Sequence, residues 1–134
     1  MKTDVKTTKV SNAALWAGRI ISVLPALMLI FGGVMNLLKP ASVLQEFGRL
    51  GYSESVAFGI GILAITCAVI YLIPSVSVLG AILLTGYLGG AVATHVRVGD
   101  PVFNVVMPIL LGVLVWGGLF LRDERMRELI PFRK

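Results

Sequence analysis

The residues of this chain that could do chemistry gather in one short stretch, between residues 87 and 104. It contains His95, Arg97 and Asp100, flanked by Tyr87 and Asn104. A histidine can accept or donate a proton near neutral pH, and an arginine can hold an anionic headgroup or a carboxylate. We therefore expect these side chains to border any small-ligand pocket. In the structural alternative, Arg97 and Asp100 pair only with each other at a loop.

Three further candidates for ligand binding, Arg19, Asn36 and Lys39, flank the first long apolar run of the chain. Polar side chains in or beside such a run are costly in a membrane and are candidates for function. Arg19 stands at the start of the run. As an alternative to ligand binding, its side chain reaches the phosphates of the lipid headgroups. Asn36 and Lys39 stand at the other end of the run and can face the cluster around His95.

The composition restricts both the environment and the chemistry. Of the 134 residues, 57% are hydrophobic and only 14% are charged, and the mean hydropathy is +0.91. Soluble domains carry roughly 45–50% apolar and about 25% charged residues. One cysteine, Cys67, and one histidine exclude an intramolecular disulfide and any metal centre built from several thiolates or histidines. The basic residues avoid the apolar runs and do not form the continuous basic face of a nucleic-acid-binding protein.

The apolar runs predict an all-α bundle of four transmembrane helices. About 20 apolar residues span a bilayer, and a continuous apolar run must be helical there because no water satisfies its backbone. Four runs meet this requirement, with breaks at Lys39-Pro40, Pro74-Ser75 and Gly99-Asp100-Pro101, and we expect the helices at about 13–38, 55–73, 76–96 and 102–121.

Two shorter amphipathic helices are expected at the membrane interfaces. Ser42 and Gln45 have the spacing of a capping box, which predicts a helix that starts at Ser42 and ends near Gly51. The tail at 122–134 places Met126, Leu129 and Ile130 opposite charged residues. A basic tail at 1–12 precedes the membrane domain.

Small residues recur every fourth position along the third apolar run, at Gly86, Gly90 and Thr94. This spacing lets helix backbones approach closely in a membrane. It predicts a packing face, used within the bundle in preference to contact with a second copy of the chain.

The distribution of basic residues predicts that both termini are cytoplasmic. An even number of spans places both termini on one side of the membrane. Nine of the 12 Lys and Arg residues lie on that side, whereas the other side has Lys39, Arg49 and Arg97. Short loops rich in Lys and Arg face the cytoplasm. We therefore expect a multi-pass membrane protein with both termini in the cytoplasm.

The third and fourth apolar runs carry a family resemblance. Residues 80–101 read GAILLTGYLGGAVATHVRVGDP, and residues 121–131 read LRDERMRELIP. Together with Gly18-Arg19 and Ile73-Pro74, these segments resemble the DoxX-like family of small bacterial membrane proteins. The resemblance covers nearly the whole chain and implies a four-helix, multi-pass bundle in the bacterial cytoplasmic (inner) membrane. It also implies an association with quinone-linked sulfur oxidation or with oxidoreductase complexes that handle thiol stress, and distant eukaryotic relatives act as assembly chaperones for receptor channels.

Three functions remain open at this point. The first is an accessory or assembly component of a membrane redox or stress system, with a membrane-protein partner or a second copy of the chain. The second is a membrane oxidoreductase that binds quinone as cofactor near His95 and Arg97. The third is a small-molecule transporter. Many family members carry an acidic residue in the second helix. The matching stretch 59–66 has none here, and neither does any other predicted span. That departure argues against transport and against quinone chemistry that needs a carboxylate there.

The predicted orientation can be tested with reporter fusions. Green fluorescent protein fused after residue 134 should fluoresce, because it folds in the cytoplasm. Alkaline phosphatase fused after Gly99 should be active, because it folds only outside. The reverse pattern, with phosphatase active at the C-terminus and inactive after Gly99, would contradict the orientation.

Overall fold

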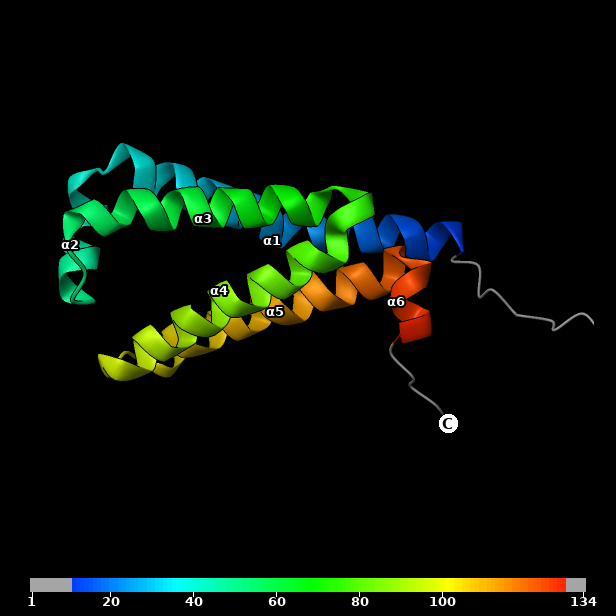
Figure 1. Ribbon diagram of the computed structural model, residues 1–134. Helices are drawn as coiled ribbons and strands as arrows, with labels where there is room; N and C mark the ends of the chain where they lie inside the picture. The colour runs from blue at the N-terminus through cyan, green and yellow to red at the C-terminus, as the bar shows by residue number, and fades with distance from the viewer. Residues whose placement is uncertain (1–10, 130–134) are drawn as a thin grey trace, which may run out of the picture.

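A computed structural model describes residues 11–129 of the protein, and within this range it contains helices and turns but no strand. Figure 1 shows their arrangement. The elements in chain order are α1 (Asn12–Leu38), α2 (Ala41–Arg49), α3 (Glu54–Leu72), the 3-10 turn η1 (Pro74–Val76), α4 (Ser77–Arg97), α5 (Val102–Arg122) and α6 (Glu124–Leu129).

Four helices within the described residues are long and apolar enough to cross a membrane. They are α1, α3, the continuous segment of η1 and α4, and α5, with mean hydropathies between 1.8 and 2.3. Each of α1, α3, α4 and α5 begins and ends within one residue of the corresponding predicted helix. Large apolar side chains such as Phe31, Phe103 and Val113 point outward and are more than half exposed, as lipid-facing residues are. The prediction of an all-α bundle with four spans is confirmed.

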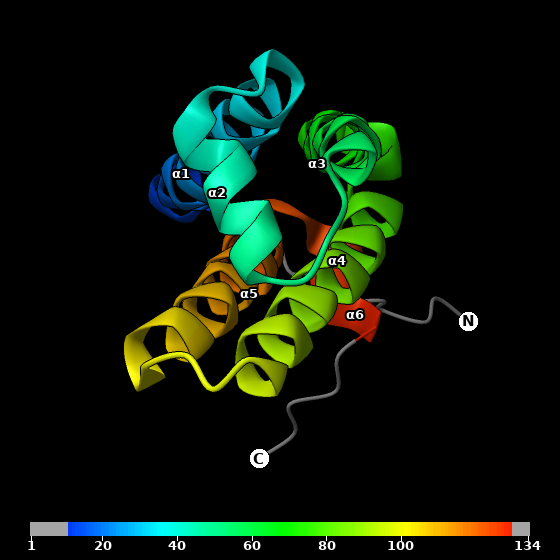
Figure 2. The same cartoon turned by 90° about the vertical axis from the view of Figure 1, so that its left-hand side faces the viewer.

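The four long helices form a ring. The principal contacts of α1 are with α3 and α5, and those of α4 are also with α3 and α5. The short helix α2 crosses one end of this ring, here called the α2 end, and α6 lies at the opposite, α6 end (Figures 1 and 2). Figure 1 also shows that the pair α1–α3 and the pair α4–α5 converge at the α6 end and diverge toward the α2 end.

The α6 end is held together by a buried tyrosine. Tyr71 of α3 is fully buried, and its hydroxyl donates to the Val115 carbonyl oxygen at 2.7 Å and lies 2.9 Å from the Ser22 hydroxyl. The Arg122 guanidinium lies over the Tyr71 ring, 4.7 Å from its centroid, and donates to the Tyr71 carbonyl at 2.8 Å. One side chain therefore connects α1, α3 and α5, because a buried hydroxyl is stable only when it is hydrogen-bonded.

Glycines allow the closest backbone approaches in this half of the bundle. A Cβ atom on Gly80 would lie 2.3 Å from the backbone nitrogen and Cα of Tyr71, and one on Gly18 would lie 2.8 Å from the backbone nitrogen of Arg122. Helices in lipid gain little from hydrophobic association, so such close van der Waals packing is a main source of their contact energy.

The short elements differ in part from expectation. The α2 helix is capped by Pro40 without a side-chain hydrogen bond, so the capping box predicted for Ser42 and Gln45 is wrong. The carbonyl of Pro40 accepts from Val43 and Leu44, which starts the helix before Ser42. Most of the predicted 1–12 tail lies outside the described residues, as do Ile130, Arg133 and Lys134 of the second tail. In the described part of the second tail the structure places α6, whose Met126 is buried.

The close approach at Gly80 predicts a position-specific loss of stability. Gly80→Ala places a methyl group against Tyr71 backbone atoms that cannot move aside, and should lower the free energy of unfolding by about 2 kcal/mol. Gly89→Ala is the matched control on the same helix, because nothing lies within 4 Å of its Cβ position and alanine favours helix. Reversible unfolding in mixed micelles, followed by circular dichroism, measures both. Equal stabilities for the two variants would contradict the packing.

Candidate ligand site at the α2 end

A pocket of about 370 Å³ lies where the two helix pairs diverge. Its walls come from α1, α3 and α4, and α2 with the turn that follows it closes the end. Small apolar residues and a few polar ones share the lining, which consists of Asn36, Phe47, Leu50, Tyr52, Ile60, Leu63, Gly86, Tyr87, Gly90, Ala91, Thr94 and His95.

The α2 helix forms the roof of this pocket. Its Phe47 and the following Leu50 are each 8% exposed, whereas Gln45, Glu46 and Arg49 face outward. The Phe47 ring packs against the Tyr52 ring with centroids 5.9 Å apart. The amphipathic pattern of α2 thus buries its apolar face against the open end of the bundle, which a surface helix does to remove that face from water. Figure 2 shows the helix lying across the end of the ring.

Two arginines tie the roof to the far side of the pocket. Arg49 of α2 donates to both carboxylate oxygens of Asp100, in the turn between α4 and α5, and also binds Glu46 on its own helix. Arg97, at the end of α4, donates to the Leu50 carbonyl oxygen. A bidentate pair between guanidinium and carboxylate fixes direction as well as distance. The two ties therefore define where α2 lies.

Asp100 also holds His95. The Nδ1 atom of His95 lies 2.5 Å from Oδ2 of Asp100, whose side chain is 5% exposed. The hydrogen bonds from Arg49 and then from His95, with a further one from Asn104, hold the pKa of Asp100 well below its usual range. The same contacts with Glu46 and Asp100 raise the pKa of Arg49. Asp100 is therefore an ionised acceptor shared by α2, α4 and α5.

A second hydrogen-bonded chain runs along the polar wall. The Thr94 hydroxyl donates to the Gly90 carbonyl at 2.8 Å. A threonine hydroxyl has one proton, so the Tyr52 hydroxyl, 2.9 Å away, donates to the Thr94 oxygen. This bond fastens the turn between α2 and α3 to α4.

Comparison with known proteins identifies the family. The sequence model of the DoxX-like family matches residues 20–118, more than half of the chain and all four membrane helices in whole or in large part. The chain belongs to the DoxX-like family. No curated protein and no solved structure gives a significant match.

The structure of this DoxX-like protein brings most of the predicted site residues together. Asn36, Tyr87 and His95 line the pocket, and Asp100 and Asn104 support His95 from behind. Lys39 ends α1 with φ of 53°, in the left-handed region, and is absent from the lining. Arg19 lies near the opposite end of α1, stacked on Trp16 at 5.0 Å, and does not join the site.

The structure differs from two of the sequence interpretations for this segment. Arg97 and Asp100 do not pair with each other, because Arg97 binds the Leu50 carbonyl and Asp100 binds Arg49 and His95. Within residues 11–129, no atom of another helix lies within 4 Å of the Cβ position of Gly86 or Gly90, so neither glycine supports close helix packing there. The helices diverge at this level, so the glycines and Thr94 line the pocket instead.

The roof contributes the site residues that sequence reasoning missed, namely Phe47, Arg49, Leu50 and Tyr52. Two sequence signals pointed toward them. Arg49 is one of only three cations predicted on its side of the membrane, and Asp100 is an acid in a turn on that same side. The length of the turn is a further signal. Because only two residues separate α1 from the amphipathic helix α2, α2 has to lie across the end of the bundle.

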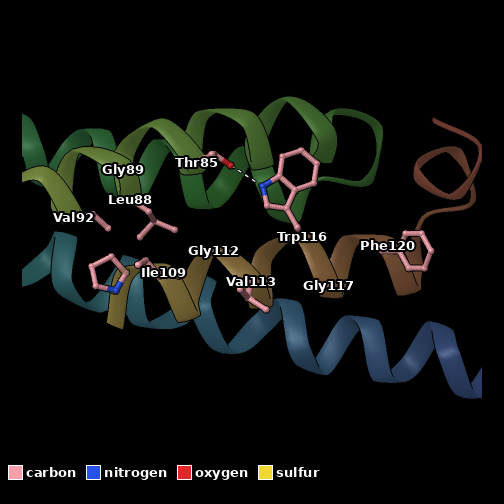
Figure 3. A pocket seen from close by; sticks show the side chains of 11 residues that line it. Thr85, Leu88, Gly89, Val92, Ile109, Gly112, Val113, Trp116, Gly117 and Phe120 are labelled. Carbon is pink, nitrogen blue, oxygen red and sulfur yellow. Dashed lines mark hydrogen bonds between the residues drawn. The ribbon is translucent and has the colours of Figure 1, made fainter. Parts of the chain in front are cut away.

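A second hollow lies on the outer surface of α4 and α5, about 650 Å³ in volume. Figure 3 shows its lining, where the Trp116 indole nitrogen donates to the Thr85 hydroxyl at 2.7 Å. Its other lining residues are apolar or glycine, including Gly89, Val92, Ile109 and Val113. The polar side chains of Thr85 and Trp116 are thus bonded to each other, and the surface of the hollow is almost entirely apolar.

The tie between Arg49 and Asp100 predicts non-additive stability. Arg49→Ala and Asp100→Asn should each lower the thermal unfolding midpoint, and the double variant should lower it by less than the sum, because residues in one network couple. Arg19→Ala, which changes an exposed arginine at the other end of α1, should leave the midpoint nearly unchanged.

Acid should weaken the same tie in wild type. A carboxylate with a lowered pKa stabilises the folded state fully above its unfolded pKa, near 3.8, and progressively less as the pH falls below that value. Asp100→Asn should lack this component. Additive single effects, or an acid dependence that survives in Asp100→Asn, would contradict the network.

Proposed function

We propose that this DoxX-like protein is an accessory component of a membrane redox or stress-response system, and that it binds a lipid-soluble molecule of the quinone class in the pocket at the α2 end. The observation that carries the binding function is the distribution of polarity in the pocket. The polar groups of His95, Thr94 and Tyr52 lie at the roof, whereas the walls farther along are formed by Ile60, Leu63, Gly86 and the largely apolar side chain of Tyr87.

This distribution suits a molecule with a polar headgroup and an apolar tail. Gly86 and His95 are nine residues apart on one helix, which corresponds to about 13 Å. The volume of about 370 Å³ falls within the range of roughly 300–1,000 Å³ typical of small-molecule sites. A quinone ring fits under the roof with the start of its tail between α3 and α4.

The pocket also reaches the membrane-facing surface. Leu63 on α3 and Gly86 and Gly90 on α4 line the pocket and are exposed at the same time. Both helices are expected to be surrounded by lipid along this length. A ligand dissolved in the bilayer therefore has a lateral route between α3 and α4, and it need not pass through the roof.

The accessory role rests on the family. The resemblance to the DoxX-like family implies association with membrane oxidoreductase complexes, and the chain belongs to that family. With both termini in the cytoplasm of a bacterial inner membrane, the pocket would lie in the outer half of the bilayer. In this arrangement the protein binds or orients the quinone, and a partner subunit exchanges electrons with it.

A quinone-binding oxidoreductase is the second candidate. The observation in its favour is the His95–Asp100 pair, because an imidazole held by a carboxylate is a competent proton acceptor beside a bound ligand. Quinone-dependent turnover by the purified protein without any partner would favour this second function over the accessory one.

Native mass spectrometry of the protein purified in mild detergent tests the proposal, because it detects ligand and partner together. The wild-type spectrum should show one bound small apolar molecule and a redox polypeptide. In Gly90→Leu the occupancy of the small molecule should fall at least tenfold, because the new side chain projects from the wall into the pocket. Gly89→Leu is the matched control: its Cβ position is equally open, but it lines the lipid-facing hollow.

Equal ligand occupancy in the Gly90→Leu and Gly89→Leu variants would contradict the pocket as the binding site. A wild-type spectrum with neither ligand nor partner, from membranes in which the redox system is expressed, would contradict the function.

A further inference from the structure

The two ring nitrogens of His95 have different surroundings. Nδ1 is 2.5 Å from Asp100, which Arg49 also holds from the outside. Nε2 has no hydrogen-bond partner within residues 11–129, and the side chain lines the pocket. The imidazole is thus fixed on one side by the protein and available to a ligand on the other.

The carboxylate determines which nitrogen carries the proton. An ionised carboxylate can only accept hydrogen bonds, and the contacts from Arg49 and His95 keep the pKa of Asp100 low. Nδ1 must therefore be protonated to make its bond. In the neutral imidazole, Nε2 then presents a lone pair.

The hydroxyl groups of Thr94 and Tyr52, near His95, donate their protons in hydrogen bonds within the protein. Thr94 donates to the Gly90 carbonyl, and Tyr52 donates to Thr94, so both oxygens offer only lone pairs to a ligand. Tyr87 lies two helical turns farther from the roof on α4, and Asn36 lies across the pocket on α1. The face formed by His95, Thr94 and Tyr52 therefore offers hydrogen-bond acceptors, whereas the donors of the lining, the Tyr87 hydroxyl and the Asn36 amide, belong to other parts of the pocket.

We propose that Nε2 of His95 accepts a hydrogen bond from the ligand, that Asp100 and Arg49 are positioning residues for it, and that the pocket therefore prefers a hydroxyl-bearing headgroup, such as a quinol, over the corresponding quinone. The preference rests on the proposed function, since it assigns the redox form of the ligand class proposed above. A quinone carbonyl placed against this face meets only lone pairs, which repel it, whereas a quinol hydroxyl in the same place donates to Nε2.

The protonation of His95 can be observed directly, because the chain has a single histidine. Protein labelled with ring-¹⁵N histidine and purified through a histidine-free tag gives two nitrogen resonances from this side chain alone. At pH 8 we expect Nδ1 protonated and Nε2 unprotonated. The opposite tautomer would overturn the proposal, whatever the binding results.

Ligand preference is measured with a benzoquinone that carries one prenyl chain and with its quinol, kept reduced under argon. The two forms have the same heavy atoms. Wild type should bind the quinol about tenfold tighter than the quinone. This ratio corresponds to one additional hydrogen bond, from the quinol hydroxyl to the imidazole that the Asp100 carboxylate holds. Asp100→Asn should reduce this ratio to about one. Asp123→Asn, at the α6 end, is the matched control and should retain it.

The ratio separates positioning from folding, because a general loss of structure weakens both forms alike. If Asp100→Asn does not fold, His95→Gln serves in its place, since a glutamine amide both donates and accepts. Equal binding of quinol and quinone by wild type would overturn the preference and leave the binding function standing. Binding of neither form would overturn both.

Discussion

The carboxylate of Asp100 joins the parts of the molecule that form the pocket. It lies in the turn between α4 and α5 and accepts hydrogen bonds from Arg49 of α2 and His95 of α4. Two of these bonds come from a guanidinium, the donor best matched to a carboxylate. Because the helix pairs diverge at this end, few backbone contacts can replace the bonds. Asp100 therefore orients the histidine and, together with the bond from Arg97 to the Leu50 carbonyl, holds the roof in place.

The glycines explain why the bundle is closed at one end and open at the other. Gly18, Gly80 and Gly118 lie where a Cβ atom would strike a neighbouring helix, near Tyr71 and Ser22. Gly86 and Gly90 lie where no neighbour comes within 4 Å. The same residue type thus serves opposite purposes on α4: near its start it allows close packing, and near its end it leaves room in a wall.

The sequence predicts the spans well because lipid allows few alternatives. An apolar segment of this length must satisfy its own backbone, so its ends follow from the first charged or turn-forming residues. The site is harder to predict. Arg49 and Asp100 are 51 residues apart in the chain, and nothing local distinguishes an arginine that binds lipid phosphate from one that binds a distant carboxylate. The spacing of Gly86 and Gly90 likewise indicates a narrow helix face, but not whether a helix or a cavity lies against it.

Stability and ligand recognition share the same bonds at the α2 end. Arg49 holds the roof by binding Asp100, and that bond also helps keep Asp100 ionised and so keeps the proton of His95 on Nδ1. Displacement of the roof would remove the partner of Asp100 and weaken the constraint on His95 at the same time. A ligand that bonds to Nε2 stabilises the same arrangement from inside the pocket. In the proposed binding mode, the hydrogen bonds that hold the roof and the hydrogen bond to the headgroup are thermodynamically coupled, because both favour one orientation of the His95 imidazole.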